Sequence, residues 1–351
     1  MATTLAPRRD PIARRFLRLV GAVAAALLVV ALPGSGQSRA AEAEPTVIAQ
    51  TPAIMAFLAA YIAEDAGIWR DNGLDVKVIN LPGIATVNAV IAGSADFALS
   101  GSDALTRAAA RGQRLLAIGA LNNQSGQLTS LRKSLAEAAH FDPDAPLAER
   151  VKALKGHTIA DGGPGSVADL FMKTIMRLGG LAPSDVTLSS IGAYELIAAF
   201  QRGAIDGVSF SLPYSLELAH GGDAVIVADG TKNEPKEFMP LAAGLILTRP
   251  QYCADHRSIC AKMGHSMAAA AKFLLTRKDE SIAILQKRFP KTDPAVVRAS
   301  YAAVARMTND PPTVTVQALK NGDSMNAAAG FLKPEDALKS YDGLFTNEYL
   351  K

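Results

Sequence analysis

Hydroxyl-bearing and glycine-rich segments stand directly after predicted strands, where they could bind a small molecule. One is Ser100-Gly101-Ser102-Asp103, which opens a predicted helix, and another is Gly162-Gly163-Pro164-Gly165-Ser166. The first turn of a helix has unpaired N–H groups and a partial positive charge, which suit an anionic head group such as a carboxylate. Ser102, Asp103 and Ser166 are also favoured N-cap types, so capping alone is the alternative for each. The glycine run lacks the spacing and the Lys-Ser/Thr ending of nucleotide-binding loops.

Two more loops and two tyrosines complete the predicted site. The loops Thr51 to Met55 and Pro82 to Thr86 follow the first and second predicted strands. In open α/β sheets, ligands lie at the carboxyl ends of the strands. Tyr194 and Tyr214 follow other predicted strand ends, where each either lines the site or packs in the core. The candidate ligand-binding residues are therefore Thr51, Met55, Gly83, Thr86, Ser100, Ser102, Gly165, Ser166, Tyr194 and Tyr214.

Alternating strand and helix patterns position these residues. Thr46 to Gln50 predicts a strand, and apolar residues at three- and four-residue steps from Met55 to Trp69 predict a helix. Apolar residues then alternate with charged ones from Leu74 to Val78, which predicts another strand. A second block of the same design begins at His157. The chain is therefore predicted to have an α/β fold with mixed, mainly parallel sheets.

An internal repeat predicts two lobes of like design. Ala92-Gly93-Ser94-Ala95-Asp96 matches Arg202-Gly203-Ala204-Ile205-Asp206 at an offset of 110 residues, and Gly112 matches Gly222 at the same offset. In each copy a helix ends at glycine and an aspartate opens an apolar strand. The predicted division places residues 44–135 and 240–351 in lobe 1, with C-terminal helices packed around it, and residues 136–239 in lobe 2.

Residues 1–43 have the pattern of a cleavable signal peptide. Arginines precede an apolar run of fourteen residues, Leu19 to Leu32, which is shorter than the roughly 20 residues that span a bilayer. We expect cleavage after Ala43, with Ala40 as the alternative, and ordinary secretion rather than the twin-arginine route. Without this segment, 30 of 36 basic and 31 of 33 acidic residues remain, so the net charge falls from +3 to about −1. The charge therefore gives no evidence for nucleic-acid binding.

The chain has two cysteines, Cys253 and Cys260, and in an oxidising compartment they could pair. On one continuous helix, seven residues would separate their Cα atoms by about 10 Å, which is too far for a disulfide. A bridge therefore requires residues 250–257 to form a loop or an irregular turn, and the sequence leaves both states open. His256 and His265 lack a ligand spacing that would favour a metal site. No metal or cofactor is expected.

Four segments together resemble one family. They are residues 66–76, residues 91–98, residues 154–160 with Gly165-Ser166, and residues 201–207. They are similar to the periplasmic substrate-binding proteins of ABC importers in the nitrate, sulfonate and taurine class, also called the SsuA/THI5-like or NMT1 type. The resemblance implies a type II fold, in which two lobes joined by two crossings hold the ligand in a cleft that closes. It also implies a monomeric periplasmic protein that delivers its ligand to a permease and ATPase complex in the inner membrane.

One departure from the family narrows the expected ligand. Related proteins often have Trp or an acidic residue just before the proline of Ser211-Leu212-Pro213. The missing carboxylate argues against cationic and zwitterionic ligands, including thiamine precursors and taurine, and favours an uncharged or anionic ligand with an apolar or aromatic body. The main prediction is a non-catalytic, extracytoplasmic solute-binding protein. Two alternatives stay open: a cytoplasmic enzyme of the same fold, for pyrimidine synthesis of the THI5 kind or chorismate processing, and a periplasmic ligand sensor. The cysteine-rich motif of the THI5 enzymes is absent from the sequence.

Overall fold

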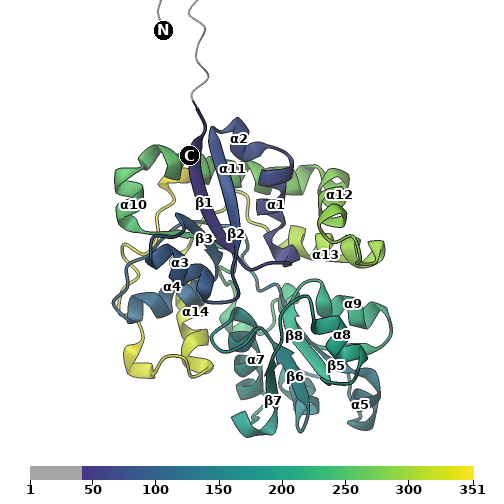
Figure 1. Cartoon of the computed structure of the whole chain (residues 1–351). Coiled ribbons are helices and arrows are strands. Elements are labelled where there is room, and N and C mark those ends of the chain that lie inside the picture. The colour runs from purple at the N-terminus through teal and green to yellow at the C-terminus, as the bar shows by residue number, and fades with distance from the viewer. Residues whose placement is uncertain (1–41) are drawn as a thin grey trace, which may run out of the picture. The chain divides into compact units, whose positions relative to one another are not determined.

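The computed structural model describes residues 42–351, in which two five-stranded sheets form the centres of two lobes (Figure 1). The first 41 residues of the predicted signal peptide lie outside the described part of the chain. Within residues 42–351, every helix is too short or too polar to cross a membrane.

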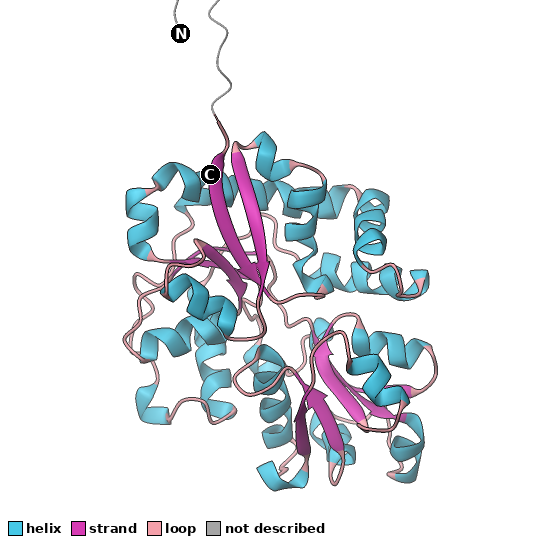
Figure 2. Cartoon of the chain, in the orientation of Figure 1, coloured by secondary structure: helices cyan, strands magenta, loops and turns pink. Residues whose placement is uncertain are grey.

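The sheet of lobe 1 has the strand order β2-β1-β3-β10-β4. Figure 2 shows strands in magenta and the helices around them in cyan. Strand β1 pairs in parallel with β2 and β3, whereas β10 is antiparallel to β3 and β4. The strands are β1 (Glu44–Gln50), β2 (Leu74–Asn80), β3 (Phe97–Ser100), β4 (Leu116–Ala120) and β10 (Leu245–Thr248). The helices between them are α1 (Leu58–Asp65), α2 (Ile68–Asp71), α3 (Ala85–Ile91) and α4 (Ser102–Ala110).

The sheet of lobe 2 repeats this design in the order β7-β6-β8-β5-β9. Strand β6 is parallel to β7 and β8, and β5 is antiparallel to β8 and β9. The strands are β5 (Gln127–Arg132), β6 (Thr158–Asp161), β7 (Thr187–Ser190), β8 (Gly207–Ser211) and β9 (Ala224–Asp229). The helices are α5 (Lys133–Ala138), α6 (Leu147–Val151), α7 (Val167–Leu178), α8 (Leu196–Gln201) and α9 (Tyr214–His220). The predicted two-lobed α/β fold is confirmed.

The repeated Gly…Asp motif has the same structural role in both lobes. Gly93 and Gly203 end their helices with φ of 78° and 74°, a left-handed conformation that favours glycine. Asp96 accepts a hydrogen bond from the N–H of Val47 at 2.8 Å, and Asp206 accepts one from the N–H of Thr158 at 2.9 Å. Each aspartate therefore joins the start of one parallel strand to its neighbour.

Two details differ from the sequence-based prediction. Strand β5 pairs with β8 and β9, so the chain first crosses between the lobes after β4 and before β5, ahead of the expected boundary at residue 136. The predicted helix from Met55 to Trp69 consists of a 3-10 turn, Met55–Phe57, followed by α1 and α2, because Gly67 breaks it with φ of 76°.

The C-terminal helices pack mainly on lobe 1, where α11 contacts α1 and α14 contacts α4. They are α10 (Pro250–Asp255), α11 (Arg257–Thr276), α12 (Lys278–Arg288), α13 (Pro294–Met307) and α14 (Val316–Ala328). Helices α13 and α14 also contact α9 and α7 of lobe 2. Cys253 and Cys260 form a disulfide with a Cα–Cα distance of 5.6 Å. The interruption at His256, between α10 and α11, brings them closer than one straight helix would.

Candidate ligand-binding site

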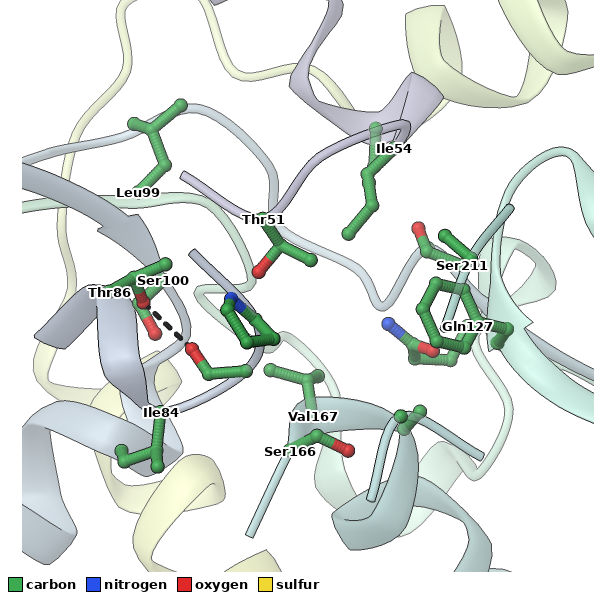
Figure 3. Close-up of a pocket in the computed structure, with 18 of the residues that line it drawn as sticks. Thr51, Ile54, Ile84, Thr86, Leu99, Ser100, Gln127, Ser166, Val167 and Ser211 are labelled. Carbon is green, nitrogen blue, oxygen red and sulfur yellow. Dashed lines mark hydrogen bonds between the residues drawn. The ribbon is translucent and has the colours of Figure 1, made fainter. Parts of the chain in front are cut away.

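A cavity of about 320 Å³ lies where the carboxyl ends of the strands of both sheets meet (Figure 3). Lobe 1 contributes the loops that follow β1, β2 and β3, and lobe 2 contributes the loops that follow β6 and β7 and the end of β8. Thr51 of lobe 1 and Val167 of lobe 2 extend into the same space in Figure 3. The cavity therefore has the position in which α/β sheets bind ligands.

Most of the predicted site residues line this cavity. Those that the structure brings together there are Thr51, Gly83, Thr86, Ser100, Gly165, Ser166 and Tyr194. The Thr86 hydroxyl donates to the carbonyl oxygen of Gly83 at 3.0 Å, which holds the turn after β2. Tyr194 is 75% exposed and lies on the loop between β7 and α8.

Three predicted site residues lie elsewhere. Met55 is fully buried, and its N–H donates to the carbonyl oxygen of Leu212 at 3.1 Å. Ser102 is fully buried against Gly322 of α14. The contact is so close that a Cβ atom added to Gly322 would lie 2.3 Å from the Ser102 Oγ. The Tyr214 hydroxyl donates to the carbonyl oxygen of Ala53 at 2.9 Å, and its ring lines a second cavity. Packing between distant segments turns these three side chains away from the first cavity.

The N-terminus of α7 provides hydrogen-bond donors to the cavity. Ser166 is both an N-cap and a lining residue, since its Oγ accepts a hydrogen bond from the N–H of Asp169 at 3.1 Å. The N–H groups of Val167 and Ala168, which follow it, make no hydrogen bond within residues 42–351. Free N–H groups in the first turn of a twelve-residue helix attract an anion. The carboxylate of Asp169 pairs with Lys173 at 2.9 Å, which offsets its own charge.

A buried pair of opposite charges adjoins this helix end. Asp103 Oδ2 and Arg107 Nη2 of α4 are 3.7 Å apart, and both residues line the cavity. Arg107 Nη2 also donates to the carbonyl oxygen of Gly165 in lobe 2 at 3.0 Å, whereas Nη1 is buried without a partner in the described part of the chain. Burial raises the pKa of the Asp103 carboxyl, against the opposing effect of Arg107. Arg107 is thus a buried cation beside the cavity, with one donor that no group uses in the described part of the chain.

Sequence reasoning missed Arg107 and the polar residues of the first crossing. Arg107 follows Asp103 by four residues on a helix that leaves a strand end, a spacing that could have predicted an ion pair at the site. Gln127, at the start of β5, lines the cavity, and its Oε1 is buried without a partner in residues 42–351. Ser211 and Leu212 precede Pro213, where the sequence differs from the residues usual in the family. Ser211 lines the cavity, whereas Leu212 is fully buried.

Apolar side chains form much of the cavity wall. They come from both lobes, which leaves the polar groups at separate points around it (Figure 3). A ligand with one polar head and an apolar body therefore matches the lining. The apolar residues are Ile54, Phe57, Ile84, Leu99, Val167 and Phe210.

Comparisons with known proteins agree with this architecture. A sequence model of the family described as NMT1/THI5 like matches residues 55–310. No curated protein sequence is significantly similar to the chain. A solved structure from Bordetella bronchiseptica RB50 is 22% identical, with 87% of this chain and 95% of that chain covered and a TM-score of 0.74.

Two other solved structures have names that describe a ligand. The alkanesulfonate-binding protein SsuA from Xanthomonas axonopodis pv. citri, bound to MOPS, is 22% identical, with 85% of this chain and 97% of that chain covered and a TM-score of 0.66. The periplasmic nitrate-binding protein NrtA from Synechocystis PCC 6803 is 15% identical, with 88% of this chain and 87% of that chain covered and a TM-score of 0.67. At these identities the likeness shows a shared fold.

Proposed function

Because the chain belongs to the NMT1/THI5-like family, we propose that it is a solute-binding protein that captures a small organic or inorganic anion between its lobes. One observation carries the proposal: a single cavity is lined by strand-end loops of both sheets, so one ligand can contact both lobes at once. A ligand that contacts both lobes stabilises the closed arrangement of the lobes.

The proposed head group is a sulfonate, a nitrate or a carboxylate. The free N–H groups of Val167 and Ala168 and the unpaired Nη1 of Arg107 are donors without a protein partner in residues 42–351. Ser166 and Thr51 add hydroxyl groups at the same cavity. An anion would satisfy these donors, and the apolar wall would contact the rest of an organic ligand. The names of the alkanesulfonate-binding and nitrate-binding neighbours are in line with this chemistry.

The proposed role is non-catalytic and lies outside the cytoplasm. It would act as a monomer in the periplasm and deliver its ligand to the permease and ATPase of an ABC importer. The fold shared with the periplasmic nitrate-binding protein NrtA supports this role, as does the predicted signal peptide. The bound solute would leave unchanged, so mass spectrometry of a ligand recovered after long incubation should find the starting compound. Recovery of a converted product would overturn the non-catalytic role.

A thermal-shift screen tests the binding proposal directly. The mature protein would be screened with sulfonates, nitrate, aromatic acids, pyrimidines and flavins. A ligand at about 100 times its dissociation constant should raise the melting temperature by about 4 °C for a chain of this size. If no anion raises it, the proposal fails.

Variants of the buried charge pair make the test specific to the cavity. Replacing both charges, as Asp103→Asn with Arg107→Met, keeps the net charge and leaves neither ion buried alone. This double variant should bind the anion about tenfold to a hundredfold more weakly, because it loses a charged hydrogen bond. Lys133→Met with Glu137→Gln, which removes an exposed pair of opposite charges on α5 outside the cavity and also keeps the net charge, is the matched control and should bind normally. Wild-type affinity in the double variant would contradict the assignment.

A further inference from the structure

A second, wider cavity adjoins the first one. Its volume is about 880 Å³, and Pro52, Ala193 and Tyr194 line both cavities. The second cavity lies between lobe 1, at the ends of β1 and β2 and the loop before α13, and lobe 2, at α8 and α9. We call the first cavity the inner cavity and the second cavity the vestibule. The two cavities therefore adjoin at Pro52, Ala193 and Tyr194.

The charges that line the vestibule cancel. Two are acidic, Glu64 and Glu217, and two are basic, Arg288 and Lys291. Arg288 is already paired with Glu64 at 2.7 Å and with Asp65 at 2.9 Å. Burial raises the pKa of Glu217 above its usual range. The vestibule therefore has no net charge to attract a second ionic group.

Aromatic rings line the vestibule. Tyr61, Tyr194 and Tyr214 all line it, and the hydroxyls of Tyr61 and Tyr214 are already bonded to the backbone of the loop after β1. Burial raises the pKa of Tyr61 to about 12, so its phenol is neutral near pH 7. Ile197 of α8 adds an aliphatic group, and Gln50 adds a buried Oε1 without a partner in the described residues. Asn80, Gln201 and Thr292 make part of the lining polar, and the tyrosine rings with Ile197 provide the part that suits an alkyl or aromatic chain.

We propose that the ligand is an amphiphilic monoanion, whose head occupies the inner cavity and whose uncharged alkyl or aromatic tail passes Tyr194 into the vestibule. This rests on the proposed function, because the inner cavity must hold the anionic head. At about 30 Å³ for a water-sized group, the inner cavity has room for about ten non-hydrogen atoms. A sulfonate head with a tail of about six carbons fills it, and longer tails reach the vestibule.

Titration calorimetry with straight-chain alkanesulfonates and alkanoates, from one to ten carbons, tests this. In one of the two series, affinity should rise about threefold to fourfold for each methylene that becomes buried, and should continue to rise beyond six carbons. The stoichiometry should stay at one ligand per protein. Two ligands per protein would mean that the cavities are filled separately and would overturn the proposal.

Variants of α8 separate the two cavities. Ala198→Trp narrows the vestibule and should reduce the gain for tails beyond six carbons, with unchanged affinity for the one- to three-carbon compounds. Ile197→Ala should lower affinity for the ten-carbon compound about threefold to tenfold and leave the short ones unchanged. Ala204→Trp, at an exposed alanine outside both cavities, is the matched control and should behave as wild type.

The outcomes distinguish this inference from the proposed function. If short anions bind but affinity stops rising at six carbons, the vestibule proposal is wrong and the anion-binding function stands. If Ala198→Trp weakens short and long compounds equally, the vestibule proposal is also wrong. If no compound of either series binds, both proposals fail.

Discussion

Two serines at the starts of similar helices have different surroundings. The Ser166 Oγ accepts the N–H of Asp169 and lines the inner cavity, whereas the Ser102 Oγ is buried beside α14 without a partner in residues 42–351. Ser166→Ala should lower the free energy of unfolding by about 1 kcal/mol through loss of a cap, and should weaken anion binding. Ser102→Ala should leave binding unchanged and should keep or raise stability by up to about 1 kcal/mol, because it removes an unsatisfied hydroxyl.

Urea unfolding and titration calorimetry of both variants check this prediction. Each variant serves as the other's control, since the same atom is removed at the first turn of a helix that follows a parallel strand. Equal loss of binding in both would place Ser102 in the site after all.

At the scale of single residues, the sequence predicts position better than orientation. Thr51, Thr86 and Ser166 were found because a residue just after a parallel strand must lie at the sheet edge where ligands bind. The orientation of Ser102 depends on Gly322, which is far away in the sequence and shows no periodic pattern that marks the contact. Arg107 was missed because it lies well inside a helix and reaches the cavity only by its long side chain.

The turn between β6 and α7 contains a buried carboxyl that should make stability depend on pH. Burial, together with a smaller effect of the Asp169 carboxylate, raises the pKa of Asp161 to about 6 against the opposing effects of the Gly163 N–H and Lys173. The folded protein therefore binds this proton more tightly than the unfolded chain does. The stabilising effect is complete below pH 4 and is lost as pH rises through about 6.

Asp161→Asn should therefore be more stable than wild type at pH 7.5, by about 1–2 kcal/mol. Asparagine keeps an oxygen that can accept the Gly163 N–H, which Asp161 Oδ1 accepts at 2.9 Å. The difference in the free energy of unfolding should shrink below pH 6 and disappear near pH 4, as urea unfolding at three pH values can measure. A difference that stays constant with pH would show that charge is not its cause.

At the scale of elements, the sequence predicted those features of the structure that neighbouring residues determine. Glycine and aspartate at the same offset predicted the repeated strand starts, because Gly93 and Gly203 need a left-handed conformation and each aspartate bonds to the neighbouring strand. Strand β5 was not recognised as part of lobe 2, because its partners β8 and β9 come about 80 to 100 residues later. Pairing over such distances leaves no periodic signal in the strand itself.

At the scale of the whole described body, the C-terminal segment connects the lobes. The ring of Phe331, which follows α14, lies between two cations, Arg107 of lobe 1 at 4.9 Å and Lys173 of lobe 2 at 4.8 Å from its centroid. Arg107 lines the inner cavity, and Lys173 is bound to Asp169 at the start of α7. Phe331 therefore joins the two elements that would hold the anion.

Phe331→Ala should shift the lobes apart in the absence of ligand. Two cation–π contacts of about 0.5–1 kcal/mol each would be lost, so anion affinity should fall about fivefold to thirtyfold. The radius of gyration from solution scattering should rise in the unliganded variant and return to the wild-type value at saturating anion, because the ligand restores the bridge between lobes. Phe273→Ala is the matched control, since that ring contacts one cation, Arg277, and both residues belong to the end of α11 rather than to the connection between the lobes. If both variants keep wild-type affinity and radius, the Phe331 contact does not couple the lobes.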